Sequence, residues 1–184
     1  MDLKLIYGNM RALCEAPQMM LHYADIPYEY KMVWDHYGSS WAEVKKDIIF
    51  NRLPILIINE DKYLWQSNTI IRYLSNLTKT KPSDEFQLAY CDAVFESTHE
   101  MFSPLNPTIN MTFGEKYNSN KKKLLEDILP NSLNNFEKLL QNSSGNFFIG
   151  NDPFYCDFNA YHHFSMCLIL DKNIFSNFPN LKKF

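Results

Sequence analysis

The chain has 184 residues, of which 46% are hydrophobic and 21% are charged, so it is long enough for one domain or for two small ones. Its formal net charge of −3 gives no indication of a nucleic-acid partner or of an anionic membrane, and no apolar run could span a bilayer. The four scattered cysteines form no CxxC motif, and the sequence opens without a secretion signal, so we expect reduced thiols in a cytoplasmic protein.

Short strands and helices alternate in the first part of the sequence. The expected elements are a strand, a helix, a second strand, a short helix, a hairpin and a further helix, at residues 3–7, 16–23, 28–33, 41–45, 52–65 and 67–77. This βαβαββα order predicts a small mixed sheet that is covered by helices on both faces.

The segment at residues 52–77 carries two features with possible chemistry. Ser67 precedes apolar residues at helical spacing and is expected to be the N-cap of a helix, where a carboxylate could bind beside its hydroxyl and the helix N–H groups. Pro54 cannot donate a ladder hydrogen bond, so the strand edge at Leu53 is open to an extended peptide. The alternative is an ordinary hairpin packed on a helix, and these residues alone favour that alternative.

After a polar, proline-bearing stretch at residues 78–83, the patterns are helical only. This change predicts two domains, 1–77 and 84–184, joined by a linker at 78–83. The expected helices of the second domain are at residues 84–102, 121–140 and 154–170, the last being very apolar and therefore central. Pro104, Pro107 and Gly114 are expected to break the chain after the first of these helices, and Pro130 is expected to kink or break the second.

The sequence resembles the cytosolic glutathione transferases along essentially its whole length. Tyr7–Glu15 aligns without a gap with a motif written Tyr-Phe-x-x-Arg-Gly-Arg-x-Glu, and Leu53-Pro54 with Gln66-Ser67 resembles the glutathione-binding segment of that family. The stretch at 150–158 is similar to a late folding motif of the same family. The resemblance is closest to the sigma class, with mu second. It implies a thioredoxin-like N-terminal domain, an all-helical C-terminal domain and a homodimer.

The resemblance also implies the site. Tyr7 takes the place of the catalytic tyrosine, whose hydroxyl donates a hydrogen bond to the glutathione sulfur, and Glu100 reaches glutathione from the neighbouring subunit. The implied glutathione-binding residues of the same subunit are Trp41, Lys45, Arg52, Leu53, Pro54 (in a cis peptide bond), Gln66 and Ser67. The implied second-substrate pocket comprises Gly8, Met10, Leu13 and Met101. Taken singly, these residues are ordinary packed aromatics, surface charges or a helix start, and only their joint spacing favours function.

The predicted function is the addition of glutathione, as co-substrate and without a metal, to a small hydrophobic electrophile. Isomerase or peroxidase activity is a further option. Gly8 and Leu13 depart from the family motif, and Phe154 replaces the Ser or Thr that caps the central helix, so Asp157 is expected to lose its capping-box partner, at a cost of about 1 kcal/mol. These departures motivate an alternative: a non-catalytic relative that serves as a binding, scaffold or structural protein.

Two other groups of residues suggest chemistry less strongly. The adjacent His162 and His163 point in different directions on a helix and have no third ligand one turn away, so packing is favoured over a metal site. Cys14 lies seven residues after Tyr7, which is too late in the chain for the nucleophile of a thioredoxin-like thiol-disulfide enzyme. We expect it inside the first helix.

Overall fold

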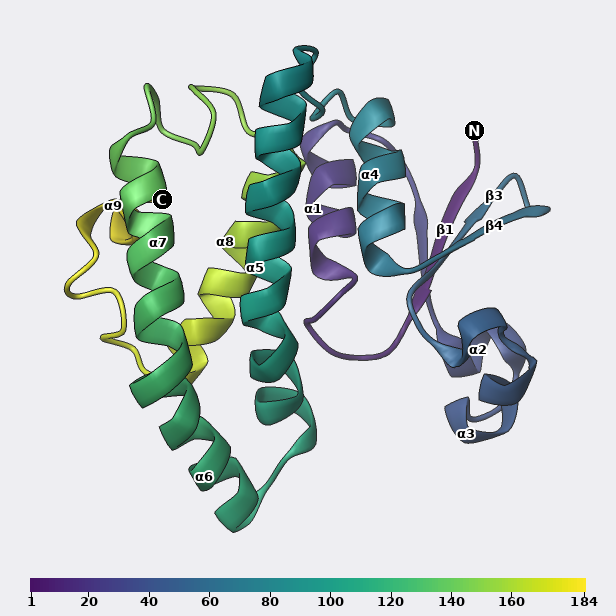
Figure 1. The fold of residues 1–184 in the computed structure, drawn as a ribbon. Coiled ribbons are helices and arrows are strands. Elements are labelled where there is room, and N and C mark those ends of the chain that lie inside the picture. The colour runs from purple at the N-terminus through teal and green to yellow at the C-terminus, as the bar shows by residue number, and fades with distance from the viewer. The chain divides into compact units, whose positions relative to one another are not determined.

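The computed structural model describes residues 1–184, and the chain divides into two compact units, Met1–Lys81 and Pro82–Phe184 (Figure 1). The first unit contains a four-stranded sheet with helices, and the second unit is helical. The predicted fold class, a thioredoxin-like unit followed by an all-helical one, is therefore confirmed. The elements of the first unit are β1 (Leu3–Tyr7), α1 (Glu15–Tyr23), β2 (Glu29–Met32), α2 (Val33–Tyr37), α3 (Trp41–Val44), single 3-10 turns at Lys45–Asp47 and Ile49–Asn51, β3 (Ile55–Ile58), β4 (Lys62–Trp65) and α4 (Ser67–Leu77).

The sheet has the strand order β2-β1-β3-β4. Strand β1 is parallel to β2 and antiparallel to β3, and the β3–β4 hairpin is antiparallel, as predicted. All four residues of β3 are buried because this strand lies inside the sheet and both of its faces are covered. The hairpin turns at Asn59 and Glu60, which both have positive φ, the backbone geometry that two-residue hairpin turns require.

Different elements cover the two faces of the sheet. Ile6, Ile55 and Ile57 form a buried cluster with residues of the segment after β2, and the side chains of Trp41 and Val44 pack against it. Alternate residues of the strands point to the opposite face. There α1 and α4 pack against each other, and α4 contacts β3 and β4 (Figure 1). Helices on both faces, as the sequence predicts, hold the strand ends in place.

The second unit is built around two packed helices. Its elements are α5 (Glu85–Met111), α6 (Gly114–Lys123), a π-helical segment (Leu124–Ile128), α7 (Leu129–Gln141), α8 (Tyr155–Leu170) and α9 (Pro179–Lys183). Helix α8 packs along α5, and most of its residues are buried, including the polar residues Asp157, Asn159, His162 and His163. Its predicted central position is confirmed.

Pro104 and Pro107 do not break α5, and this expectation was wrong. Each proline removes one N–H donor, which leaves the carbonyls of Glu100 and Ser103 without their usual helical partners. Both of those residues are exposed, so water can supply the missing hydrogen bonds. The helix instead follows its buried side chains, which continue past the first proline to Leu105. Gly114, by contrast, lies at the interruption between α5 and α6, as expected.

The helix is not broken at Pro130, because α6 continues into α7 through a π-helical segment. The residues before this proline, Leu124–Ile128, form the π-helical segment, and Pro130 occupies the first turn of α7. A proline in a regular helix would clash with the carbonyl four residues earlier, here that of Glu126. In the wider π turn the N–H of Leu129 donates to the carbonyl of Leu124, five residues earlier, and this change of register relieves the conflict at Pro130.

The stretch predicted as a linker is packed at its start. The side chains of Thr78 and Thr80 are buried, and their hydroxyls lie 2.8 Å apart. The Thr78 hydroxyl also donates to the carbonyl of Leu74 over 3.0 Å, which extends the end of α4. The two units divide between Lys81 and Pro82.

The expectation that Asp157 loses its capping partner was wrong in part. Phe154 indeed offers no side-chain cap, yet its backbone N–H donates to the Asp157 carboxylate over 2.8 Å. The backbone N–H of Phe148 donates to the other carboxylate oxygen over 3.0 Å. Between them Gly150 has a φ of +74°, a conformation that favours glycine. Asp157 therefore fixes both the start of α8 and the loop before it.

Candidate active site

The sheet register brings together three of the predicted site residues. Ile6 pairs with Ile55 on β3, and Ile55 pairs with Trp65 on β4. Tyr7, Pro54 and Gln66 each lie one residue beyond these pairs in the same direction, because neighbouring strands here run antiparallel. The end of β1, the start of β3 and the end of β4 therefore place them at one edge of the sheet.

Tyr7 ends β1, and its side chain is only 6% exposed. Burial raises the pKa of its hydroxyl to about 12, although a hydrogen bond from the backbone N–H of Leu13 acts in the opposite direction. That N–H lies 3.3 Å from the Tyr7 oxygen. The phenol is therefore protonated at neutral pH, accepts one hydrogen bond, and keeps its own proton for donation to another acceptor.

The loop after Tyr7 is held by a second tyrosine. The Tyr30 hydroxyl, on β2, donates to the Gly8 carbonyl over 2.8 Å. A side chain at Gly8 would meet only Met10 at an ordinary 3.8 Å, so neither space nor backbone conformation requires a glycine there. Met10 is exposed and Leu13 is half-buried. Sequence reasoning missed Tyr30, because only the pairing of β2 with β1 brings it near this loop.

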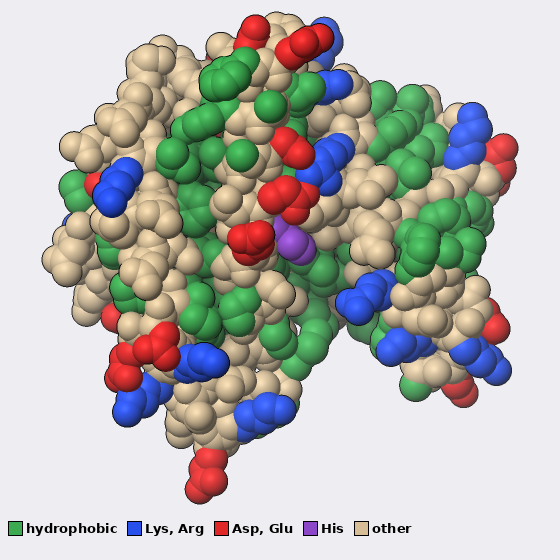
Figure 2. Space-filling view, in the orientation of Figure 1, with side chains coloured by type: hydrophobic (Ala, Val, Ile, Leu, Met, Phe, Trp, Pro, Cys, Tyr) green, Lys and Arg blue, Asp and Glu red, His purple; other side chains and the backbone are tan.

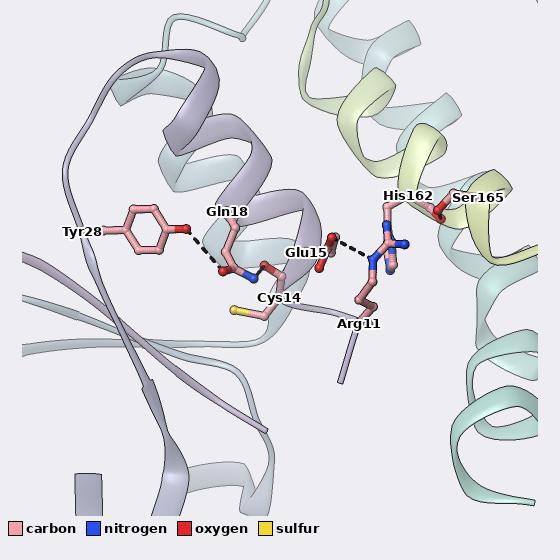
Figure 3. Close-up of polar contacts among 7 residues, drawn as sticks. All are labelled: Arg11, Cys14, Glu15, Gln18, Tyr28, His162 and Ser165. Carbon is pink, nitrogen blue, oxygen red and sulfur yellow. Dashed lines mark hydrogen bonds and ion pairs between the residues drawn. The ribbon is translucent and has the colours of Figure 1, made fainter. Parts of the chain in front are cut away.

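Polar contacts fix the start of α1 (Figure 3). Arg11 forms an ion pair with Glu15 at 2.9 Å, and Gln18 donates to the carbonyl of Cys14 over 3.3 Å. Tyr28 donates in turn to Gln18. Cys14 lies directly before α1 rather than inside it, and burial raises the pKa of its thiol. A protonated, buried thiol is inert as a nucleophile, so Cys14 serves packing here.

The start of α4 differs from the prediction. Ser67 is the first residue of the helix and not its N-cap; that position belongs to Gln66, whose φ is +70°. Only Gln66 separates β4 from α4, so the chain reverses at this one residue, and a non-glycine residue with positive φ stores about 1–3 kcal/mol of strain. The Ser67 hydroxyl is buried beside Asn68. The first N–H groups of α4 follow at this point, with no partner inside the helix.

Leu53 and Pro54 precede β3, and the peptide bond between them is cis, as the resemblance implies. Pro54 is buried and Leu53 is half-buried against the Ile6 cluster. The backbone of Leu53 lies outside the paired part of β3, whose pairing begins at Ile55.

Basic side chains gather over the α2–α3 part of the first unit (Figure 2). Lys45 and Arg52 are both exposed there, and Trp41 is half-buried on the sheet cluster. Glu43 anchors the start of α3 by accepting hydrogen bonds from the side chain and backbone of Ser40 and from Ser39, which hold the pKa of its carboxyl at about 2. Trp41 therefore begins a helix with a fixed N-terminus, Lys45 directly follows that helix, and Arg52 follows the 3-10 turn Ile49–Asn51.

The predicted residues of the second unit lie on α5. Glu100 is exposed and Met101 is buried. His162 and His163 are both buried on α8, and the His163 ring stacks on Phe102 with centroids 3.9 Å apart. Burial lowers the pKa of His163, so its ring is neutral. The ring nitrogen Nδ1 lies 3.0 Å from the carbonyl oxygen of Thr98.

The structure contains no group of three or more His, Cys, Asp or Glu side chains that could hold a metal ion. None of its helices is both long and apolar enough to cross a membrane.

The comparisons with known proteins cover both units. Residues 1–76 match the family described as Glutathione S-transferase, N-terminal domain, and residues 99–184 match Glutathione S-transferase, C-terminal domain. The chain is 28% identical to Glutathione S-transferase P of Caenorhabditis elegans, covering 100% of this chain and 86% of that protein. It is 31% identical to a Glutathione S-transferase of Plasmodium yoelii yoelii over 79% of this chain and 68% of that protein.

A solved structure agrees with these matches. The Pi-class glutathione S-transferase of Onchocerca volvulus is 26% identical and has a TM-score of 0.85, over 100% of this chain and 85% of that one. A thioredoxin-like unit followed by a helical unit, each matched by its own family domain, defines a glutathione-dependent transferase. The chain belongs to the glutathione S-transferase family.

Proposed function

We propose that this transferase activates the thiol of glutathione with the Tyr7 hydroxyl. The observation that carries the proposal is the state of that hydroxyl, which is buried, protonated at neutral pH and hydrogen-bonded by the Leu13 N–H. An acceptor bond polarises a hydroxyl and makes it a stronger donor. A hydrogen bond from Tyr7 to sulfur favours the thiolate over the thiol, whose reference pKa is about 8.5.

Glutathione binding follows from the same edge of the sheet. The γ-glutamyl carboxylate would accept from the first N–H groups of α4 and from Ser67, with Gln66 beside it. The backbone of Leu53, before the cis Pro54, would pair with the cysteinyl unit. Trp41, Lys45 and Arg52 would hold the glycine carboxylate. Strain at Gln66 supports this assignment, because strained backbone concentrates at ligand sites.

The reaction would then be a positioned attack. The thiol proton leaves to solvent, and the bound thiolate forms a carbon–sulfur bond with a small hydrophobic electrophile. The electrophile then releases its leaving group to solvent, as chloride from a chloronitrobenzene, or, if it is an activated alkene, takes up a proton from solvent. Gly8, Met10 and Leu13 of the first unit are proposed to line the pocket for that second substrate. Isomerisation or peroxide reduction would use the same activated sulfur.

The finer assignments rest on sequence resemblance. We place the chain nearest to the sigma class, in the cytoplasm, with a glutathione-binding domain at 1–77, a linker at 78–83 and a helical domain at 84–184. We also propose a homodimer, in which the exposed Glu100 of one subunit reaches the glutathione of its neighbour. Multi-angle light scattering that gave a monomer at working concentration would remove both the dimer and this role of Glu100.

The first experiment combines glutathione binding by calorimetry with conjugation to a chloronitrobenzene. Saturable turnover together with binding is the expected result. Binding without turnover would favour the non-catalytic alternative or an electrophile that this pocket rejects. A lack of glutathione binding would overturn the proposed site.

A further inference from the structure

Tyr30 lies on the same face of the sheet as Tyr7. In the parallel pair of β1 and β2, Tyr30 is opposite Leu5, and Tyr7 is opposite Met32. Side chains alternate between the two faces along a strand and paired residues share a face, so Tyr30 points to the same side as Leu5 and Tyr7. Tyr30 therefore stands one strand away from the proposed catalytic hydroxyl, on the side of the sheet that α1 and α4 cover.

The Tyr30 hydroxyl is a donor with a fixed partner. It donates to the carbonyl of Gly8 over 2.8 Å, an ordinary length for an O–H donor. Burial raises the pKa of this hydroxyl, and the other titratable groups that act on it are Cys14, Tyr7, Glu15 and Tyr28. None of these groups is a cation that would favour ionisation, so the Tyr30 phenol keeps its proton and its hydrogen bond at neutral pH.

The hydrogen bond to Gly8 fixes the start of a loop that returns to Tyr7. Gly8 follows Tyr7 directly in the sequence, and at the end of the loop the backbone N–H of Leu13 donates to the Tyr7 hydroxyl over 3.3 Å. This distance is longer than the usual range for an N–H donor, so a small displacement of the loop would weaken the bond further. The geometry of the loop therefore decides how strongly Leu13 acts on Tyr7.

The far end of the loop is held by contacts that do not involve Tyr30 (Figure 3). The backbone N–H of Glu15 donates to the carbonyl of Ala12 over 3.1 Å, and the side chain of Gln18 donates to the carbonyl of Cys14 over 3.3 Å. The side chains of Ala12 and Cys14 are also buried. This end of the loop thus moves with α1.

The near end of the loop has no such support from its own side chain. Gly8 has no side chain to bury, and a glycine has more backbone conformations open to it than any other residue. The hydroxyl of Tyr30 supplies the side-chain contact that restricts it. Loss of that hydroxyl would free the Gly8 end of the loop while the Leu13 end stays attached to α1.

We propose that Tyr30 is a positioning residue for the transferase reaction. By holding the Gly8 carbonyl, it keeps the Leu13 N–H on the Tyr7 hydroxyl and so keeps that hydroxyl a strong donor to the glutathione sulfur. This inference rests on the proposed role of Tyr7. Because Tyr30 acts through Tyr7 and has no contact with glutathione in this scheme, its loss should affect the chemical step and not glutathione affinity.

The test is a double-mutant cycle of Tyr7→Phe, Tyr30→Phe and the combined variant. Steady-state kinetics with varied glutathione gives kcat and KM, and thiolate absorbance in the complex with glutathione gives the pH midpoint of the bound thiol. Tyr28→Phe is the matched control, because it removes the same group directly before β2, where the hydroxyl bonds the side chains of Gln18 and His22 instead of the loop. Urea denaturation measures the stability of each variant.

Tyr30→Phe should lower kcat about 3- to 10-fold, the effect of one hydrogen bond, with KM for glutathione within about twofold of the wild type. The midpoint of the bound thiol should rise, by less than in Tyr7→Phe. In the combined variant, loss of the Tyr30 hydroxyl should have no further effect, because the group through which it acts is already absent. Tyr28→Phe should keep the wild-type kcat and midpoint even if it loses as much stability as Tyr30→Phe.

The cycle separates this inference from the proposed function. A shifted midpoint in Tyr7→Phe with an unchanged one in Tyr30→Phe would leave the role of Tyr7 standing and overturn that of Tyr30. Additive losses in the combined variant, or losses of kcat in Tyr28→Phe as large as in Tyr30→Phe, would also overturn it, since both are expected of a hydroxyl that only stabilises the fold. An unchanged midpoint in Tyr7→Phe would overturn the proposed function and this inference together.

Discussion

The backbone N–H of Leu13 donates a hydrogen bond to the hydroxyl oxygen of Tyr7 over 3.3 Å. Leu13 stands where the family motif has an arginine, and on sequence grounds this change removes a cation from near the tyrosine. The contact to Tyr7 comes from the main chain, however, and does not depend on which side chain position 13 carries. The hydrogen bond to the Tyr7 phenol oxygen is therefore retained, whichever side chain occupies position 13.

Replacing Tyr7 with Phe should separate catalysis from binding. The hydroxyl is the only group that the change removes, and in the proposed mechanism it contacts the sulfur. Turnover of the chloronitrobenzene should fall by about 100-fold, the usual cost of losing one donor to a developing anion. The Kd for glutathione, measured by calorimetry, should stay within about threefold because most of the binding groups lie elsewhere.

The control for this change is Tyr28→Phe. Tyr28 is a partly exposed tyrosine that hydrogen-bonds Gln18 and His22 and has no proposed contact with glutathione. Its turnover should match the wild type. Equal losses of turnover and affinity in Tyr7→Phe, or a loss in Tyr28→Phe of the same size, would contradict the role given to Tyr7.

The pH dependence of kcat/KM should report the thiol of glutathione and not Tyr7. Because the pKa of Tyr7 is raised to about 12, the phenol stays protonated and able to donate throughout pH 6–10. The rising limb in the wild type should therefore have a midpoint below about 8.5, the reference value of a thiol. In Tyr7→Phe that midpoint should move up towards the reference value.

The measurement is a pH–rate profile of both proteins in buffers of constant ionic strength, with thiolate absorbance followed in the ultraviolet. A wild-type profile that falls again below about pH 10 would mean that the phenol ionises far earlier than its burial implies. A midpoint that is the same in both proteins would show that Tyr7 does not stabilise the thiolate.

Ser67→Ala should weaken glutathione binding more than it slows the chemical step. The hydroxyl is proposed to contact the γ-glutamyl carboxylate in both the ground state and the transition state, so its loss should raise KM by about 5- to 30-fold with kcat little changed. Steady-state kinetics with varied glutathione checks this. Ser75→Ala on the same helix is the control, since its hydroxyl is occupied by the carbonyl of Arg72. A fall in kcat with unchanged KM would count against the assignment.

Asp157→Ala should destabilise the fold. The change leaves the buried N–H of Phe148 and the N–H of Phe154 without their acceptor, at about 1–3 kcal/mol for each group. Urea denaturation should show the loss in the transition of the helical unit. Asp152→Ala, an exposed aspartate in the preceding loop, should change the unfolding free energy by less than about 0.5 kcal/mol. A similar midpoint for both variants would show that the two hydrogen bonds contribute little.

Local patterns predicted the first unit well because each of its strands follows a simple rule. The run Ile55–Ile58 is apolar throughout and lies inside the sheet, and the polar tip after it forms the turn. Pro104 and Pro107 show where such rules fail. A proline is a local signal for the end of a helix, but α5 is held by side chains that bury against α8, and this burial is decided by distant residues.

In the candidate site, too, some features could be predicted from sequence and others could not. Side chains at family spacing, such as Tyr7 and Gln66, can be found from sequence. The hydrogen bond from Leu13 is made by the backbone, and the bond from Tyr30 to Gly8 depends on strand pairing, so neither leaves a signal in the side-chain pattern. The assumed cap at Ser67 failed by one residue for the same reason, since the positive φ of Gln66 begins the helix earlier. The roles given to these residues in binding and catalysis stay predictions.

The π-helical segment Leu124–Ile128 has a consequence for the length of the chain around it. A π turn holds more residues than an α turn, so the π-helical segment determines which way the side chains of the following helix, α7, point. Deleting one residue there would rotate α7 by about 100° and turn Leu133 and Phe136 out of the core. Glu126 and Asp127 are exposed, so other side chains could replace them. The number of residues in the segment, however, must stay the same to keep the side chains of α7 in the core.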